Sequence, residues 1–178
     1  MSELKEQSLE VESAALASAT GAGDAAIMTP ASIYDRACRQ VVGITAEVNY
    51  TNFFGISSSS AVTGTGFVVS ENGYILTNYH VIEYAYTAGK APTVVLHDGT
   101  HYTASVVGVE EGNDIAVLKI DAANLSPAKL GDSDGLTVGD TIYAVGNPLG
   151  DLEFSMSTGH ISALDRVIKT EESSESIN

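Results

Sequence analysis

Two hairpin turn signals constrain the fold of this chain more than any other feature. Asn72-Gly73 separates "VTGTGFVVSE" from "YILT", and Asp98-Gly99 separates "TVVLH" from "THYTASVVGV". Asn-Gly and Asp-Gly readily adopt the left-handed backbone that tight turns between antiparallel strands require. Because no long helical pattern lies between the strands, the sequence predicts an all-β fold, a mainly antiparallel barrel or sandwich, and not a parallel α/β sheet.

Shorter patterns complete the expected strand order. Strands are expected within 41–48, 114–120, 139–146 and 154–167, which are rich in β-branched or apolar residues. The polar stretch 49–60, which ends in four serines, is expected to be a loop.

A short helix is expected in "MTPASIYDRACRQ", residues 28–40. Thr29 is a suitable cap, Pro30 suits the first turn, and apolar residues four apart give the helix one apolar face. Residues 1–30 otherwise have the composition of a linker or flexible segment.

The charge of the chain argues against one class of partner. The formal net charge is −15, so the phosphates of a nucleic acid would be repelled. Almost half of this charge lies at the two ends, with −4 in residues 1–30 and −3 in residues 170–178. Solvated flanks are the simpler interpretation, and an acidic recognition tail is the alternative.

The single cysteine, Cys38, rules out an internal disulfide and a cysteine-based metal cluster. No stretch reaches the roughly 18 consecutive apolar residues of a membrane helix. The opening residues are small, as at a signal cleavage site, but they lack a cationic start and an apolar centre. If the natural protein is exported or anchored, the segment responsible is expected outside this chain.

Gly64-Thr65-Gly66 has two interpretations. A G-x-G after a strand can open a phosphate-binding loop, but such a loop must lead into a helix. Here "FVVSENGY" follows, which is another strand pattern. We therefore expect these glycines to allow tight packing or a bend.

His80 and Asp114 are the candidate catalytic residues. Taken alone, His80 in "LTNYHVIEY" fits a packed histidine, and Asp114 in "GNDIAVLKI" fits a polar turn before a buried strand. As a pair they fit the activation of a serine. A neutral imidazole takes the hydroxyl proton at one ring nitrogen, while a carboxylate holds the proton on the other nitrogen and stabilises the imidazolium that forms.

Four segments, in this order, resemble the HtrA/Deg family of trypsin-like serine proteases. They are "GTGFVVSENGYILTNYHVI", "GNDIAVLKI", "LGDSDGLTVGDTIYAVGNPLG" and "STGHISALDR". The resemblance covers about residues 31–170. It implies a double β-barrel with the active site between the barrels, His80 as general base and Asp114 as orienting carboxylate. Residues 64–67 and 146–150 would be structural signatures of the first and second barrel.

The family's nucleophile lies in a Gly-Asn-Ser-Gly-Gly motif, which does not occur in the 178 residues. Ser133, in "GDSDG", is not expected to replace it, because it follows Asp114 by only 19 residues. Asp134 beside it would also place negative charge where an oxyanion must be stabilised. Ser155 and Ser157 lie in a strand pattern without a tight glycine turn. The resemblance therefore implies a chain that ends before its nucleophile.

The resemblance predicts a flexible segment at 1–30, a complete first barrel at 31–130 and the start of a second barrel at 131–178. It implies endoproteolysis of unfolded or damaged proteins, no metal or organic cofactor, and a location in the cell envelope or outside the cytoplasm. Family trimers suggest a homo-oligomer, and strand exchange between copies is expected if strands are missing. The alternatives are a pseudoprotease that binds extended peptides and a structural fragment without activity.

Overall fold

The computed structural model describes residues 28–51, 57–147 and 154–165. The chain divides into two compact units, residues 1–32 and 33–178. Helix α2 (Pro30–Cys38) is capped by Thr29, whose Oγ1 accepts the backbone N–H of Ser32 at 3.2 Å. The predicted short helix and its cap are confirmed.

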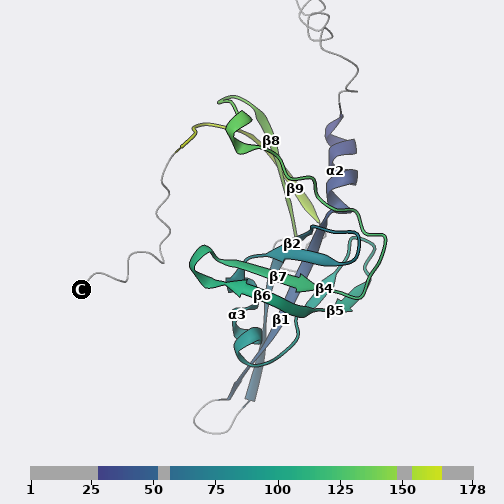
Figure 1. Cartoon of the computed structure of the whole chain (residues 1–178), viewed down its shortest axis with the longest axis vertical. Coiled ribbons are helices and arrows are strands. Elements are labelled where there is room, and N and C mark those ends of the chain that lie inside the picture. The colour runs from purple at the N-terminus through teal and green to yellow at the C-terminus, as the bar shows by residue number, and fades with distance from the viewer. Residues whose placement is uncertain (1–27, 52–56, 148–153, 166–178) are drawn as a thin grey trace, which may run out of the picture. The chain divides into compact units, whose positions relative to one another are not determined.

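The second unit consists mainly of antiparallel strands (Figure 1). Its seven-stranded sheet contains β1 (Val41–Thr51), β2 (Ser57–Val68), β3 (Tyr74–Thr77), β4 (Thr93–Val95), β5 (His101–Thr103), β6 (Ser105–Glu110) and β7 (Ile115–Lys119). A two-stranded sheet contains β8 (Thr141–Gly146) and β9 (Ser155–His160). The helical elements of this unit after α2 are α3 (Tyr79–Thr87) and the 3-10 helices η1 (Glu111–Asn113) and η2 (Ser133–Gly135).

The seven-stranded sheet curls so that its two edges meet. Its strand order is β5-β4-β1-β2-β3-β7-β6, which places β5 and β6 at opposite ends. In a flat sheet these edges would lie about 29 Å apart, at roughly 4.8 Å per strand. Yet only Ala104 separates β5 from β6 in the chain, and Ala104 is buried. The prediction of a mainly antiparallel β fold is therefore confirmed, with one sheet rolled around a core, while the expected all-β composition is modified by the helices α2 and α3.

The interior of the curled sheet holds the apolar core. Burying each large aliphatic side chain contributes about 1.5–3 kcal/mol, so this cluster is the main source of stability. Its buried members are Val42, Ile44, Val68, Ile75, Val81, Ile82, Val94, Ala104, Ala116, Leu118 and Ile120.

Both predicted hairpin turns are confirmed. Gly73 joins β2 to β3 with φ of 97°, and Gly99 joins β4 to β5 with φ of 80°. Gly73 has a second requirement, because a Cβ there would overlap the carbonyl oxygen of Ile120.

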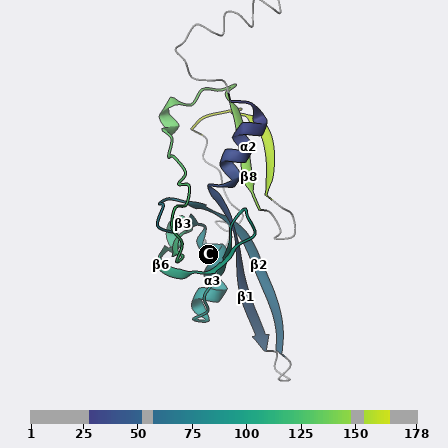
Figure 2. The same cartoon turned by 90° about the vertical axis from the view of Figure 1, so that its right-hand side faces the viewer.

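The range predicted as a loop, 49–60, includes residues that belong to strands at both of its ends. β1 continues to Thr51 and β2 begins at Ser57, in an unbroken register from Val41↔Phe67 to Thr51↔Ser57 (Figure 2). Polar composition suggested a loop, but ladder pairing satisfies the backbone whatever the side chains are. Residues 52–56 lie outside the described residues.

The glycines at 64 and 66 serve packing, as predicted. A Cβ on Gly64 would lie 2.5 Å from Val81 Cγ2 of α3. A Cβ on Gly66 would lie 2.9 Å from side-chain atoms of Ile44 and Ile75. These glycines therefore let α3 and the core approach β2 closely, and they do not form a phosphate loop.

Candidate active site

Helix α3 carries His80 at its first turn, directly after β3. The helix is anchored by Val81, Ile82 and Ala85, whose spacing directs one face to the core. His80 points away from that face and is exposed. The helix has nine residues, Tyr79–Thr87.

Asp114 lies at the start of β7, after the short helix η1. The Glu110 side chain caps η1 by accepting the backbone N–H of Asn113 at 2.8 Å. Asp114 then adopts φ 54° and ψ 48°, a left-handed conformation that aspartate tolerates better than most residues. The turn ends η1 and begins the strand.

The pairing of β3 with β7 brings the two candidate residues together. The strands run antiparallel, with Thr77 opposite Ala116, so the end of β3 lies beside the start of β7. Residues shortly after β3 and shortly before β7 therefore meet at one edge. This explains how residues 34 apart in the chain become neighbours.

His80 and Asp114 form a two-point contact. His80 Nδ1 lies 2.7 Å from Asp114 Oδ2, and the His80 backbone N–H donates to Asp114 Oδ1 at 2.8 Å. An ionised carboxylate only accepts hydrogen bonds, so Nδ1 carries the proton in the neutral ring. Nε2 then keeps a lone pair, as a general base requires.

The contact is made at the surface. The His80 and Asp114 side chains are 61% and 41% exposed, so solvent screens the attraction between them. Burial raises the pKa of Asp114, but hydrogen bonds from His80 and Asn78 and the charge of His80 outweigh it and lower the pKa overall. The carboxylate is therefore ionised at neutral pH.

Two neighbouring residues escaped the sequence analysis. Asn78 Nδ2 donates to the carbonyl oxygen and to Oδ2 of Asp114, both at 3.1 Å. Tyr79 is buried, which raises its pKa, and the charge of Glu111 and a hydrogen bond to it raise the pKa further. Both residues tie α3 to the turn that carries Asp114. Their adjacency to His80 was the only sequence signal.

The candidate serines lie elsewhere. Ser133 is in η2, where its carbonyl accepts the Leu136 N–H, and Ser155 and Ser157 are in β9. Among the described residues, no serine hydroxyl hydrogen-bonds the His80 ring. The structure therefore brings His80 and Asp114 together, with no serine hydroxyl from the described residues bound to the ring.

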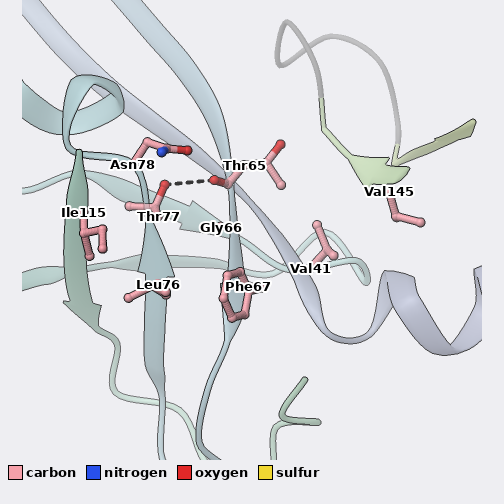
Figure 3. A pocket seen from close by; sticks show the side chains of 9 residues that line it. All are labelled: Val41, Thr65, Gly66, Phe67, Leu76, Thr77, Asn78, Ile115 and Val145. Atoms are coloured by element: carbon pink, nitrogen blue, oxygen red, sulfur yellow. Dashed lines mark hydrogen bonds between the residues drawn. The ribbon is translucent and has the colours of Figure 1, made fainter. Parts of the chain in front are cut away.

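A cavity of about 310 Å³ is lined by Asn78 and Ile115, the residues adjoining α3 and Asp114 in the chain, and Figure 3 shows the side chains around it. Two of the residues that line it are hydrogen-bonded to each other: Thr77 Oγ1 donates to the Thr65 carbonyl oxygen at 2.8 Å. The lining residues are mostly apolar: Val41, Thr65, Gly66, Phe67, Leu76, Thr77, Asn78, Ile115 and Val145.

Metal ligands and membrane-spanning helices were sought in residues 28–51, 57–147 and 154–165. No cluster of three or more His, Cys, Asp or Glu side chains there could hold a metal ion. Within the same residues, no helix is both long and apolar enough to cross a membrane.

The family model that matches the chain is described as the trypsin-like peptidase domain, over residues 64–177. A probable periplasmic serine endoprotease DegP-like from Chlamydia muridarum (strain MoPn / Nigg) is 45% identical over 126 residues, covering 66% of this chain and 24% of that protein. The putative serine protease HhoB from Synechocystis sp. (strain ATCC 27184 / PCC 6803 / Kazusa) is 43% identical over 104 residues, covering 58% of this chain and 24% of that protein. This chain thus spans about a quarter of the length of these relatives.

A solved structure of an HtrA-type protease with a decapeptide resembles the chain in fold. Its TM-score is 0.66 at 32% sequence identity, covering 76% of this chain and 45% of that one.

Proposed function

Since this chain belongs to the family of trypsin-like peptidase domains and its relatives are HtrA/DegP-like serine endoproteases, we propose that it serves in serine endoproteolysis of that type. His80 is the general base and Asp114 its orienting carboxylate. The observation that carries this proposal is the two-point contact, with Nδ1 to Oδ2 at 2.7 Å and the backbone N–H to Oδ1 at 2.8 Å. It fixes the ring and its tautomer together.

The proposed reaction is acyl transfer. His80 Nε2 takes the proton of a serine hydroxyl while the serine oxygen adds to the scissile carbonyl carbon. The imidazolium, stabilised by the Asp114 carboxylate, then gives that proton to the leaving amine as the C–N bond breaks. Water, activated by the same imidazole, hydrolyses the acyl ester and restores the serine.

The nucleophile is the serine of the family's Gly-Asn-Ser-Gly-Gly segment, which does not occur in these 178 residues. Without a serine against Nε2, the base has no hydroxyl to activate, and removing the nucleophile from a triad leaves little catalysis. The 178-residue chain alone therefore has no peptidase activity. In the double β-barrel of this family, the seven-stranded sheet corresponds to the first barrel and β8–β9 to the start of the second.

The proposed substrates are unfolded or damaged polypeptides, which can enter an open active site as extended chains. Relatives are named as periplasmic serine endoproteases, so we assign this protein to the cell envelope. By analogy with family trimers, the working form is a homo-oligomer.

The test uses the complete product of the coding sequence that contains this chain, assayed for casein hydrolysis. Asp114→Asn should lower kcat by about 10⁴-fold, and His80→Ala should lower it by about 10⁶-fold. Activity retained in both variants would refute the roles of these residues. No activity in the complete product, despite peptide binding, would favour the pseudoprotease instead.

A fluorophosphonate probe, which acylates only activated serines, tests the 178-residue chain itself. We expect no labelled serine by mass spectrometry. A label on Ser133, lost in His80→Ala, would show that the nucleophile lies in this chain.

A further inference from the structure

We propose that Asn78 is a positioning residue, which holds the Asp114 carboxylate in the orientation that His80 needs. This inference deepens the proposed function and rests on it. Asn78 would touch neither the substrate nor the reacting atoms, and it acts through Asp114.

The first support is a hydrogen bond that Asn78 does not make. Asn78 is the N-cap residue of α3, with φ −79° and ψ 144°, and asparagine at this position normally caps the helix with its side chain. Its side chain makes no such cap bond. Instead, Nδ2 donates to Asp114 O and Asp114 Oδ2, both at 3.1 Å. The amide is therefore directed across to Asp114.

The second support is that Asp114 supplies the missing cap. Its Oδ1 accepts the backbone N–H of His80, the second residue of α3, at 2.8 Å. The first turn of α3 contains no acidic residue of its own. Asp114 therefore brings negative charge to the positive end of the helix from a distant part of the chain. Asp114 thus takes the capping role that local sequence would assign to Asn78, and the Asn78 amide binds Asp114 instead.

These contacts fix the carboxylate. Oδ2 accepts from the ring of His80 and from the Asn78 amide, while Oδ1 accepts from the His80 backbone. Rotation of the carboxylate about its Cβ–Cγ bond would break these bonds together. The Asn78 amide and the Tyr79 backbone N–H also donate to the Asp114 carbonyl, which holds the left-handed residue in place.

The experiment is NMR on the intact 178-residue chain. It follows the carboxyl ¹³C signal of Asp114 and the imidazole ¹⁵N signals of His80 with pH. The titratable groups on the elements packed around this carboxylate are His80 and Tyr79 of α3, Glu110 at the end of β6 and Glu111 of η1, so their signals are followed too. Asn78→Ala should raise the pKa of Asp114 and broaden the Nδ1–H signal of His80, because Oδ2 loses a donor.

Asn78→Ser separates positioning from helix capping. Serine is a good N-cap, so it should keep thermal stability near that of the parent chain. It has a single O–H donor, so it cannot replace both bonds of the amide, and the Asp114 pKa should still rise. If serine instead restores the Asp114 titration together with stability, Asn78 serves only the helix end and the proposal is wrong.

Asn113→Ala is the matched control. Asn113 lies next to Asp114, and its side chain makes no hydrogen bond to the residues that the structure describes. It should change neither signal, whereas unchanged signals in Asn78→Ala would overturn the proposal. In the complete coding product, Asn78→Ala should lower kcat by about 10-fold to 100-fold with little change in KM. An inactive parent would refute the proposed function and leave the NMR result intact.

Discussion

The carboxylate of Asp114 holds His80 by its backbone and by its ring at once, at 2.8 Å to the N–H and 2.7 Å to Nδ1. A contact to the ring alone would leave the start of α3 free to move relative to the carboxylate. The backbone bond ties the start of α3 to the same carboxylate, so the helix, the ring and the carboxylate keep one arrangement. This arrangement does not depend on strong attraction, since both side chains are substantially exposed.

The pKa of Asp114 predicts how stability depends on pH. Its folded-state pKa is lowered below the ordinary value of 3.8. The stabilisation is therefore fully present above that ordinary value and is lost as pH falls through the lower, folded value. We expect Asp114→Asn to have a shallower loss of stability below about pH 4 than the parent chain. Urea unfolding followed by circular dichroism between pH 3 and pH 7 measures this.

Asp121→Asn is the control for that titration. Asp121 is exposed, and its carboxylate accepts no hydrogen bond from the residues described. This variant should lose stability below about pH 4 as steeply as the parent chain does. If Asp114→Asn also loses stability as steeply as the parent chain, the bonds from His80 and Asn78 to Asp114 do not persist in solution.

Close packing of α3 on β2 predicts a large cost for Gly64→Ala. The new methyl group would lie 2.5 Å and 2.6 Å from the two γ-carbons of Val81, so the helix or the strand must shift. Overpacking of this kind costs about 1–3 kcal/mol of unfolding free energy. Gly108→Ala, with open space around its Cβ, should cost less. Similar costs at both positions would show that α3 is not packed tightly on β2.

Exposed apolar residues between 130 and 164 predict self-association. Their exposed fractions are 77% for Leu130, 56% for Val138 and 41% for Ile142. A two-stranded sheet cannot bury such side chains by itself. Light scattering after size-exclusion chromatography should show a mass that rises with concentration and falls in the double variant Val138→Lys/Ile142→Lys.

Val107→Lys is the comparison for that variant. Val107 is 55% exposed, but it lies on β6 of the seven-stranded sheet. It should leave the mass unchanged. A clean monomer of the parent chain at all concentrations would contradict association, and an equal effect of Val107→Lys would place the contact elsewhere.

Local signals determined how much of the fold could be predicted. The turns at Gly73 and Gly99 were predictable because a backbone with positive φ strongly favours glycine at that position. The extent of β1 and β2 was not, because ladder pairing with a neighbouring strand extends both into polar sequence. The length of α3 could not be predicted from local sequence, since its apolar face depends on what it packs against.

In the candidate site, too, some residues were predicted from the sequence and one was not. His80 and Asp114 were found through resemblance in their flanking segments, and their proximity follows from the β3–β7 register. Asn78 was not found, because an asparagine before a helix predicts a local cap. Its actual partner lies 36 residues away, which no pattern near Asn78 indicates.

The join between the two sheets gives the last prediction. Gly43 and Thr65 are opposite each other on β1 and β2, and Asn147 after β8 contacts both. Its backbone N–H donates to Thr65 Oγ1 at 2.9 Å, and its amide fills the space where a Gly43 Cβ would lie. Gly43→Ala should therefore cost about 1–3 kcal/mol by overpacking.

Asn147→Ala removes the amide that the new methyl group of Gly43→Ala would overlap. The costs of the two substitutions in unfolding free energy should therefore not be additive. We expect the double variant to be more stable than the sum of the single costs by at least about 0.5 kcal/mol, measured by urea unfolding. Gly108→Ala combined with Asn147→Ala should be additive, because Gly108 has no neighbour within 4 Å of its Cβ position. If the Gly43 and Asn147 changes also add, the amide does not lie over Gly43 in solution. The two sheets would then be joined without this contact.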